Sequence, residues 1–142
     1  MNPSGRTVFV DTVAWLALAN RSDRLHKAAA QMNRKLLGNG ARYITTDAVL
    51  AEVGNALARP PMRGPVIRFL GALVSSPRLR IVFTDRGRFE RALRLYSDRP
   101  DKEWGLTDCI SFTVMGDEHL QQAFTADRHF QQAGFSCLLT PP

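Results

Sequence analysis

The sequence lacks most features of an exported, membrane-bound or zinc-binding protein. No apolar run approaches the ~20 residues that a helix needs to cross a bilayer, and the start, MNPSGRT, has no apolar core of a secretory signal. The two cysteines, Cys109 and Cys137, stand apart in apolar surroundings and form no C-x-x-C pair, which favours buried, reduced thiols over a disulfide or a zinc site. We therefore expect no membrane partner and a cytoplasmic location.

Several common catalytic motifs are also missing. The three histidines share no H-E-x-x-H spacing, and neither a G-x-x-x-x-G-K-[ST] loop nor a G-x-S-x-G elbow occurs. These absences argue against zinc proteases, P-loop nucleotide hydrolases and serine hydrolases. His129 lies two residues after an aspartate, but its pattern favours a surface helix position over a role at a site.

Positive charge, in contrast, is abundant. Lys and Arg number 19 against 13 Asp and Glu, which gives a formal net charge of +6. Because arginine binds phosphate with two parallel hydrogen bonds, a basic domain of this size suggests RNA or DNA as a partner. A basic surface that only maintains solubility is the alternative.

Two kinds of side chain are candidates for contact with RNA. Arg91 and Arg94 share one face of an expected helix, where they either contact phosphates or form a solvated face. Trp104 is able to stack on an unpaired base, but we expect it to close the core under its loop.

The chain alternates between strand-like and helix-like patterns. Short apolar or β-branched runs predict five strands, at residues 7–10, 42–45, 80–83, 122–125 and 135–139. Strands separated by helices predict right-handed crossovers and a mostly parallel sheet of about five strands covered on both faces. We expect one α/β domain over residues 1–142.

Two of the intervening helical patterns lead to specific expectations. The stretch SDRLHKAAAQMNRKLLG opens on Ser22, which we expect to cap its helix. In residues 85–98, helical spacing predicts four buried side chains: Phe89, Ala92, Leu93 and Tyr96.

Acidic residues occur where such a fold places its ligands. Asp11 and Asp127 each follow a predicted strand, Asp108 begins a helix, and Glu52 has a spacing that puts it on or beside the buried face of its helix. Ligands bind outside the carboxyl ends of parallel strands, so we expect the four acids to converge. Taken singly, each aspartate is also a reasonable helix N-cap, and Glu52 can extend to solvent or meet an arginine.

Converging carboxylates repel one another unless a cation neutralises them. Oxygen ligands alone select a hard ion, Mg²⁺ or Mn²⁺, and such an ion activates water and screens a phosphodiester. Three threonines beside the acids either orient them by hydrogen bonds or serve as local caps: Thr12, Thr107 and Thr125.

Four stretches of the chain, FVDTVAWLAL, TTDAVLAEVGNAL, LTDCISFTVM and AFTADRHFQQAGF, resemble the signature blocks of PIN-domain ribonucleases, especially VapC-type toxins of bacterial toxin–antitoxin pairs. The resemblance covers almost the whole chain and implies a PIN-like, three-layer α/β/α domain. It implies a catalytic acidic quartet, with Asp11 and Asp108 as the firmest metal ligands: Asp11, Glu52, Asp108 and Asp127.

The same resemblance implies Mg²⁺- or Mn²⁺-dependent endoribonuclease activity, homodimerisation and inhibition by a small antitoxin protein. One position departs from the pattern. Many relatives have serine or asparagine two residues after the first aspartate, where this chain has Val13.

Two other functions compete with an RNA-cleaving enzyme. A metal-dependent phosphatase or phosphotransferase would use Asp11 as its nucleophile, but such enzymes commonly place a second acid at the position that Val13 occupies. A non-catalytic nucleic-acid-binding module with a structural divalent ion would carry the same acids and the same basic surface.

Overall fold

The computed structural model describes residues 6–141. Five strands form one fully parallel sheet, with the order β3-β2-β1-β4-β5. The strands are β1 (Thr7–Val10), β2 (Arg42–Thr46), β3 (Leu79–Val82), β4 (Gln122–Phe124) and β5 (Ser136–Cys137). The expected five-stranded α/β architecture is therefore confirmed, although β5 is shorter than the sequence pattern suggested.

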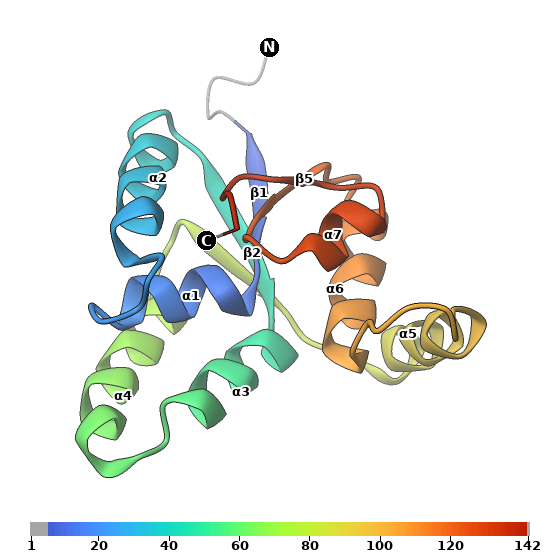
Figure 1. Ribbon diagram of the computed structural model, residues 1–142, viewed down its shortest axis with the longest axis horizontal. Coiled ribbons are helices and arrows are strands. Elements are labelled where there is room, and N and C mark those ends of the chain that lie inside the picture. Colours follow the sequence, from blue (N-terminus) through green and yellow to red (C-terminus); the bar gives the residue numbers. More distant parts are fainter. Residues whose placement is uncertain (1–5, 142) are drawn as a thin grey trace.

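Helices cover both faces of this sheet (Figure 1). They are α1 (Thr12–Ala19), α2 (His26–Gly38), α3 (Asp47–Ala56), α4 (Pro60–Val74), α5 (Arg86–Asp98), α6 (Leu106–Asp117) and α7 (Arg128–Gln132). Helices α1 to α4 lie on one side of the sheet, and α5 to α7 lie on the other. This division follows from right-handed crossovers, because the chain moves outward from β1 to β3 and then returns to the opposite side of β1.

The core forms where the strands are covered from both sides. Val8, Phe9 and Val10 of β1 are fully buried, as expected for a central strand of a parallel sheet. Trp104 is also buried, and its Nε1 donates a hydrogen bond to Gln132 Oε1 at 3.0 Å. The expectation that this tryptophan closes the core under its loop is confirmed.

The expectation of a Ser22 cap is wrong. Helix α2 begins at His26, and the preceding residues form turns in which Asp23 Oδ1 accepts the backbone N–H of Leu25. Because Asp23 satisfies this N–H outside the helix, the helical hydrogen-bond pattern starts later than the apolar spacing suggested.

The expected burial of one face of α5 is also largely wrong. Ala92 is buried, but Phe89, Leu93 and Tyr96 are 43%, 46% and 50% exposed. Helix α5 packs mainly against α6 at the side of the molecule, and no other element of residues 6–141 covers the rest of its apolar residues (Figure 1).

The strand order creates a natural ligand site. Within the sheet, β2 and β3 follow one another outward from one edge of β1, and β4 and β5 follow outward from its other edge. The strand order therefore reverses between β1 and β4. The residues that follow these two strands lie at the carboxyl edge, next to each other. Within residues 6–141, no helix has both the length and the apolar character needed to span a bilayer.

Candidate acidic site

Asp11 directly follows β1 and is nearly inaccessible, with 4% of its surface exposed. It occupies the N-cap position of α1, yet its side chain makes no capping hydrogen bond. Instead, Thr125 Oγ1, beyond the end of β4, donates to Asp11 Oδ2 at 2.9 Å. The cap interpretation therefore does not account for this side chain.

Burial dominates the electrostatics of Asp11 and raises its pKa to about 7. The backbone N–H of Thr12 and the hydroxyl of Thr125 oppose this rise, and the charges of Asp108 and Asp127 add to it. A carboxyl group with such a pKa is unstable as a bare anion, and a bound cation would restore its ionised form.

Asp108 lies in the first turn of α6, on the other side of the sheet from α1. Its Oδ2 accepts two hydrogen bonds, from the backbone N–H of Gly105 at 3.0 Å and from His129 Nδ1 at 3.0 Å. Burial raises the pKa of Asp108, and these two donors oppose the rise.

Asp127 is the one aspartate of the three whose side chain caps a helix in the usual way. Its Oδ1 accepts the backbone N–H of His129 at 2.9 Å at the start of α7. Its own backbone N–H donates to Thr125 Oγ1 at 3.1 Å, so a single hydroxyl connects Asp127 with Asp11. The cap and the acidic cluster are thus compatible roles for this residue.

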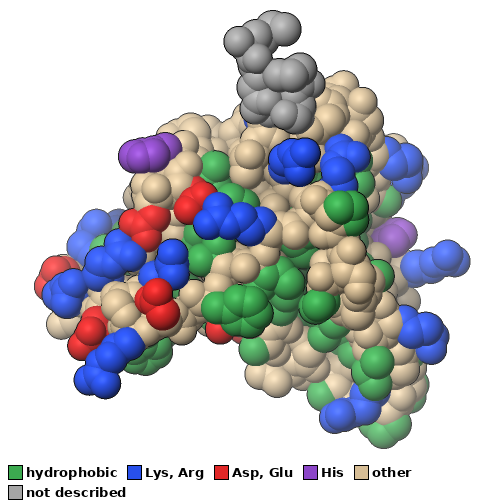
Figure 2. All heavy atoms as spheres, turned by 180° about the vertical axis from the view of Figure 1, so that it is seen from behind, with side chains coloured by type: hydrophobic (Ala, Val, Ile, Leu, Met, Phe, Trp, Pro, Cys, Tyr) green, Lys and Arg blue, Asp and Glu red, His purple; other side chains and the backbone are tan. Residues whose placement is uncertain are grey.

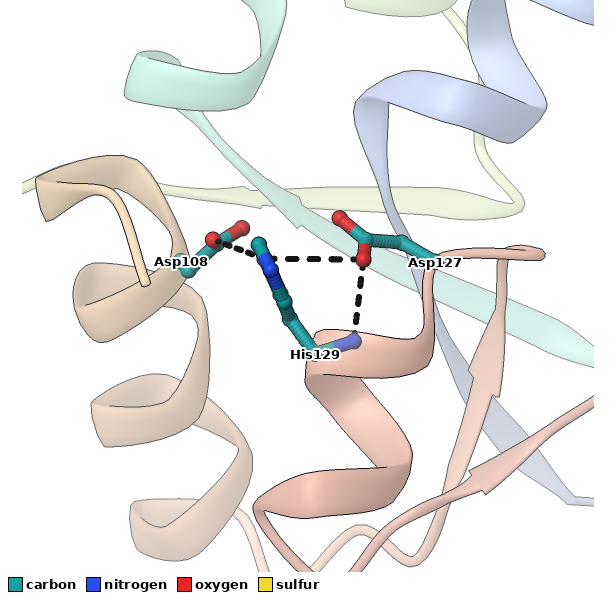
Figure 3. Close-up of side chains that lie close together, drawn as sticks. All are labelled: Asp108, Asp127 and His129. Atoms are coloured by element: carbon teal, nitrogen blue, oxygen red, sulfur yellow. Dashed lines mark hydrogen bonds and ion pairs between the residues drawn. The ribbon is translucent and has the colours of Figure 1, made fainter. Parts of the chain in front are cut away.

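Three residues come close enough to share one ion. Asp108, Asp127 and His129 each offer a ligand atom, and these atoms lie within 4.8 Å of one another (Figure 3). Asp11 approaches the two aspartates closely enough for their charges to raise its pKa. Within residues 6–141, His129 is the only basic side chain in ion-pair contact with any of the three aspartates. We call Asp11, Asp108 and Asp127 the acidic cluster.

The acidic cluster has carboxylate oxygens that are free to bind a divalent ion. Among the hydrogen bonds of residues 6–141, Asp108 Oδ1 and Asp127 Oδ2 accept none, so each carboxylate keeps an oxygen for a ligand. Two carboxylates and a buried third supply hard oxygen donors without a lysine or arginine to neutralise them. This donor set suits Mg²⁺ or Mn²⁺.

Glu52 is not part of the group formed by Asp108, Asp127 and His129. Val49 and Val53 form the buried face of α3, and Glu52 lies beside that face with an exposed side chain rather than on it. Thr12 Oγ1 donates to Glu52 Oε1 at 2.7 Å, which connects the glutamate to the residue after Asp11. Glu52 is thus held near the start of α1 but remains accessible to solvent.

The three threonines have different roles. Thr125 binds two aspartates, and Thr12 binds Glu52. Thr107 contributes its backbone oxygen to the hydroxyl of Ser111, and its own hydroxyl makes no hydrogen bond within the described part of the chain. The structure thus gives an orienting contact to Thr12 and Thr125 only.

The two candidate arginines lie away from the acidic cluster. Arg91 forms a two-pronged ion pair with Asp117 at the C-terminus of α6, with N–O distances of 2.8 and 2.7 Å. Asp108 is near the other end of the same helix, roughly 14 Å away at the helical rise. Arg94 is exposed. Figure 2 shows acidic and basic side chains interspersed over this side of the molecule.

The sequence analysis favoured a surface helix position for His129, and this is wrong, because the structure places the imidazole against Asp108 and Asp127. It is half-buried, and its Nδ1 lies 3.0 Å from Asp108 Oδ2 and 3.5 Å from Asp127 Oδ1. The sequence did contain a feature that could have indicated this position. His129 lies in the first turn of a helix whose N-cap is Asp127, and a residue there lies beside the side chain of the N-cap residue.

Comparisons with known proteins agree with this architecture. The model of the PIN domain family matches residues 8–136. The 23S rRNA-specific endonuclease VapC20 of Mycobacterium tuberculosis is 28% identical over 128 residues, which cover 90% of this chain and 95% of the relative. The resemblance to PIN domains drawn from the four sequence blocks is confirmed.

Solved structures give the same result. The crystal structure of VapC20, described as a sarcin–ricin loop cleaving toxin, superposes with a TM-score of 0.79 at 27% identity, over 90% of this chain and 95% of that one. VapBC2 from Rickettsia felis, bound to a promoter DNA fragment, has a TM-score of 0.69 at 15% identity and covers 92% and 96%. FitAcB from Neisseria gonorrhoeae has a TM-score of 0.64 at 16% identity and covers 93% and 96%. The last two show a shared fold.

Proposed function

Because the chain belongs to the PIN-domain family, we propose that it is a metal-dependent endoribonuclease that hydrolyses RNA phosphodiester bonds at the acidic cluster. The observation that carries this proposal is the uncompensated charge of three aspartates at the carboxyl edge of the sheet. Within residues 6–141 no lysine or arginine pairs with them, although the protein as a whole is basic. A divalent cation would neutralise such a cluster, and the hydrolysis of an RNA phosphodiester is a reaction that a bound divalent cation assists.

The proposed roles follow from the contacts. Asp11, Asp108 and Asp127 would hold the ion, Mg²⁺ or Mn²⁺, with Asp11 and Asp108 as its main ligands. When bound, such an ion lowers the pKa of a coordinated water and stabilises the charge on the phosphate. Thr125 holds Asp11 and Asp127 in place. Glu52, held by Thr12 and exposed, is proposed as a proton acceptor at the rim.

We also propose a biological setting. The whole chain, residues 1–142, acts as one nuclease domain and as the toxin of a toxin–antitoxin pair in the cytoplasm. It forms a homodimer, and a cognate antitoxin inhibits it by placing an Arg or Lys near Asp11 and Asp108, where negative charge is in excess. Because the relative VapC20 is named for 23S rRNA, a ribosomal RNA hairpin is the first substrate to test.

Two observations weigh against a phosphatase that uses Asp11 as nucleophile. The carboxylate is 4% exposed, and one of its oxygens is already bound by Thr125. A nucleophilic carboxylate must approach the phosphorus atom directly, and the low exposure and the bound oxygen of Asp11 do not favour such an approach. The position of a second acid is filled by Val13.

A cleavage assay tests the proposal against a binding module. The purified protein is incubated with a labelled sarcin–ricin hairpin and with a scrambled hairpin, in Mg²⁺, in Mn²⁺ and in EDTA. We expect cleavage with either ion, none in EDTA, and none by Asp11→Asn. Asp98→Asn, which changes an exposed aspartate at the end of α5, serves as the matched control and should retain activity. Cleavage that persists in EDTA, or hairpin binding without any cleavage, would refute the proposal.

A further inference from the structure

His129 connects the two half-buried members of the acidic cluster, Asp108 and Asp127. Its backbone N–H donates to Asp127 Oδ1 at 2.9 Å, and its ring nitrogen Nδ1 lies 3.0 Å from Asp108 Oδ2 (Figure 3). Phe130, the next residue, is fully buried and packs against Phe112 of α6, with ring centroids 5.0 Å apart. The imidazole is therefore carried by a turn that is itself anchored to the helix of Asp108.

The contact with Asp108 indicates which ring nitrogen is the donor. Asp108 Oδ2 already accepts the backbone N–H of Gly105, so this oxygen acts as an acceptor. An ionised carboxylate only accepts hydrogen bonds, and the nearby Asp127 Oδ1 is an acceptor as well. His129 Nδ1, which faces both oxygens, is thus assigned as the donor of this hydrogen bond.

Two donors on one oxygen fix the orientation of the carboxylate. Gly105 and His129 hold Oδ2 of Asp108 from two different elements, the start of α6 and α7. Rotation of the carboxylate would break both bonds. Oδ1 is left without a protein partner within residues 6–141, so it is the oxygen available to a cation.

We propose that His129 is a positioning residue for the divalent ion: its Nδ1–H holds Asp108 so that Oδ1 faces the ion, and its backbone sets Asp127 beside it. This inference rests on the proposed function, because it assumes that the acidic cluster binds a divalent ion. Hydrogen bonds from neighbouring groups to ligating carboxylates commonly contribute 10- to 100-fold to metal affinity.

Mn²⁺ binding to the protein alone, followed by the electron paramagnetic resonance signal of free Mn²⁺, tests this role without RNA. His129→Ala removes the donor, and His129→Gln places an amide where Nε2 was, beyond Asp108. His129→Asn places an amide near the Nδ1 position and should rescue the contact. We expect 10- to 100-fold weaker Mn²⁺ binding for the Ala and Gln variants and an affinity within about threefold of wild type for Asn.

A matched control separates positioning from a general effect of losing a histidine. His26 is also half-buried, and its Nδ1 is hydrogen-bonded to the oxygen of Ala17 at 2.7 Å, outside the acidic cluster. His26→Gln should leave Mn²⁺ affinity unchanged. Thermal melts in EDTA check that all variants are folded before titration.

A spectroscopic measurement separates positioning from direct ligation. Electron spin-echo modulation of bound Mn²⁺ detects a coordinated imidazole nitrogen, and we expect no such coupling in the wild type. A directly bound nitrogen, or equal Mn²⁺ affinity in wild type and His129→Gln, would overturn the positioning role and leave the proposed nuclease intact. Absence of Mn²⁺ binding by the wild type would overturn both proposals.

Discussion

The two ends of helix α6 shift the pKa of an aspartate in opposite directions. At the C-terminal end, Asp117 forms an ion pair with Arg91, and the hydrogen bonds from this arginine lower the pKa of the carboxyl. At the N-terminal end, no arginine or lysine of residues 6–141 lies within ion-pair distance of Asp108, and burial raises its pKa. The helix dipole alone would give the opposite result, because it favours an anion at the N-terminus and disfavours one at the C-terminus.

The comparison shows where the protein leaves negative charge uncompensated. Arginines are plentiful, and they neutralise Asp85, Asp101, Asp117 and Glu118 on the outer surface. Among residues 6–141, the acidic cluster is in ion-pair contact only with the imidazole of His129. Because no arginine neutralises these acids in an otherwise basic protein, we propose that a metal cation does so.

The largest effect that we expect is the loss of RNA cleavage when the aspartate at the N-terminal end of α6 is changed. Asp108→Asn should reduce RNA cleavage by about 10³-fold or more, because the lost ligand contributed several kcal/mol to the transition state. In EDTA, the same variant should be as stable as wild type or more stable, since one of the repelling charges is gone. Cleavage rates and thermal melts, with EDTA and with excess Mn²⁺, measure both effects.

Asp117→Asn is the matched control, because it changes the same residue type on the same helix. It should keep cleavage near the wild-type rate and be slightly less stable through the loss of an exposed ion pair. Clear destabilisation of Asp108→Asn in EDTA, together with residual cleavage and an undiminished stabilisation by Mn²⁺, would return Asp108 to the role of a helix cap.

The hydroxyl that links the aspartates should have the next largest effect. Thr125→Val preserves shape but removes the donor to Asp11 and the acceptor for Asp127. We expect a 10- to 100-fold loss of Mn²⁺ affinity, measured by calorimetric titration. Thr45→Val removes an equally buried hydroxyl, which donates to the oxygen of Val10, and should destabilise the fold without this loss of affinity. Equal losses for both variants would show that only packing is involved.

The pH dependence of stability should have opposite signs in the two regions. In the absence of metal, burial raises the pKa of Asp11 in the folded protein to about 7, well above the ordinary value of 3.8 for an aspartate. Between pH 4 and 7 the folded protein keeps a proton that the unfolded chain has lost, so the free energy of unfolding falls as pH rises, by about 1.4 kcal/mol per unit at most. The contribution of Asp117, whose pKa is lowered, is instead lost as pH falls below its unfolded value.

Denaturant unfolding from pH 4 to 8 in EDTA, for wild type and Asp11→Asn, measures the contribution of Asp11 as a difference. The wild type should lose stability relative to Asp11→Asn as pH rises to 7, and the difference should level off above that. Excess Mn²⁺ should remove the loss, because the ion replaces the proton. A pH-independent difference between the two proteins would contradict the raised pKa.

The smallest effect concerns RNA binding by α5. Arg91 is engaged by Asp117, whereas Arg94 has no ion pair within residues 6–141. Arg94→Ala should therefore reduce the salt dependence of RNA binding by about one phosphate contact at most, and Arg91→Ala by less. Fluorescence anisotropy at several salt concentrations measures both slopes. A larger change for Arg91→Ala would show that RNA displaces Asp117 from its arginine.

The sequence predicted most reliably the central strands of the sheet, because burial of both faces gives such strands a continuous apolar pattern. The β-branched runs before Asp11 and Asp127 predicted β1 and β4 and therefore the meeting of these two aspartates. For Glu52, helical spacing indicated a position on or beside the buried face of α3, and the structure shows an exposed side chain beside that face. Spacing alone does not distinguish a position on a buried face from one at its edge.

Other features depend on neighbours that no local pattern describes. Phe89, Leu93 and Tyr96 have the spacing of a buried face, but whether an element covers them is decided by the placement of α5 beside α6. The role of His129 likewise depends on the packing of α7 against α6, which brings its ring to Asp108. These contacts arise from tertiary structure, so single-sequence reasoning missed them.

The bond between Thr125 and Asp11 has a consequence for synthesis of the protein. These residues are 114 positions apart in the chain, and the backbone N–H of Asp11 also donates to the oxygen of Phe124 at 3.2 Å. Contacts of such long range form late in folding, and a ribosome releases the N-terminal part first. A nascent chain therefore displays Asp11 long before Asp108 and Asp127 exist to join it. The acidic cluster, which we propose as the metal site, therefore assembles only once translation is nearly finished.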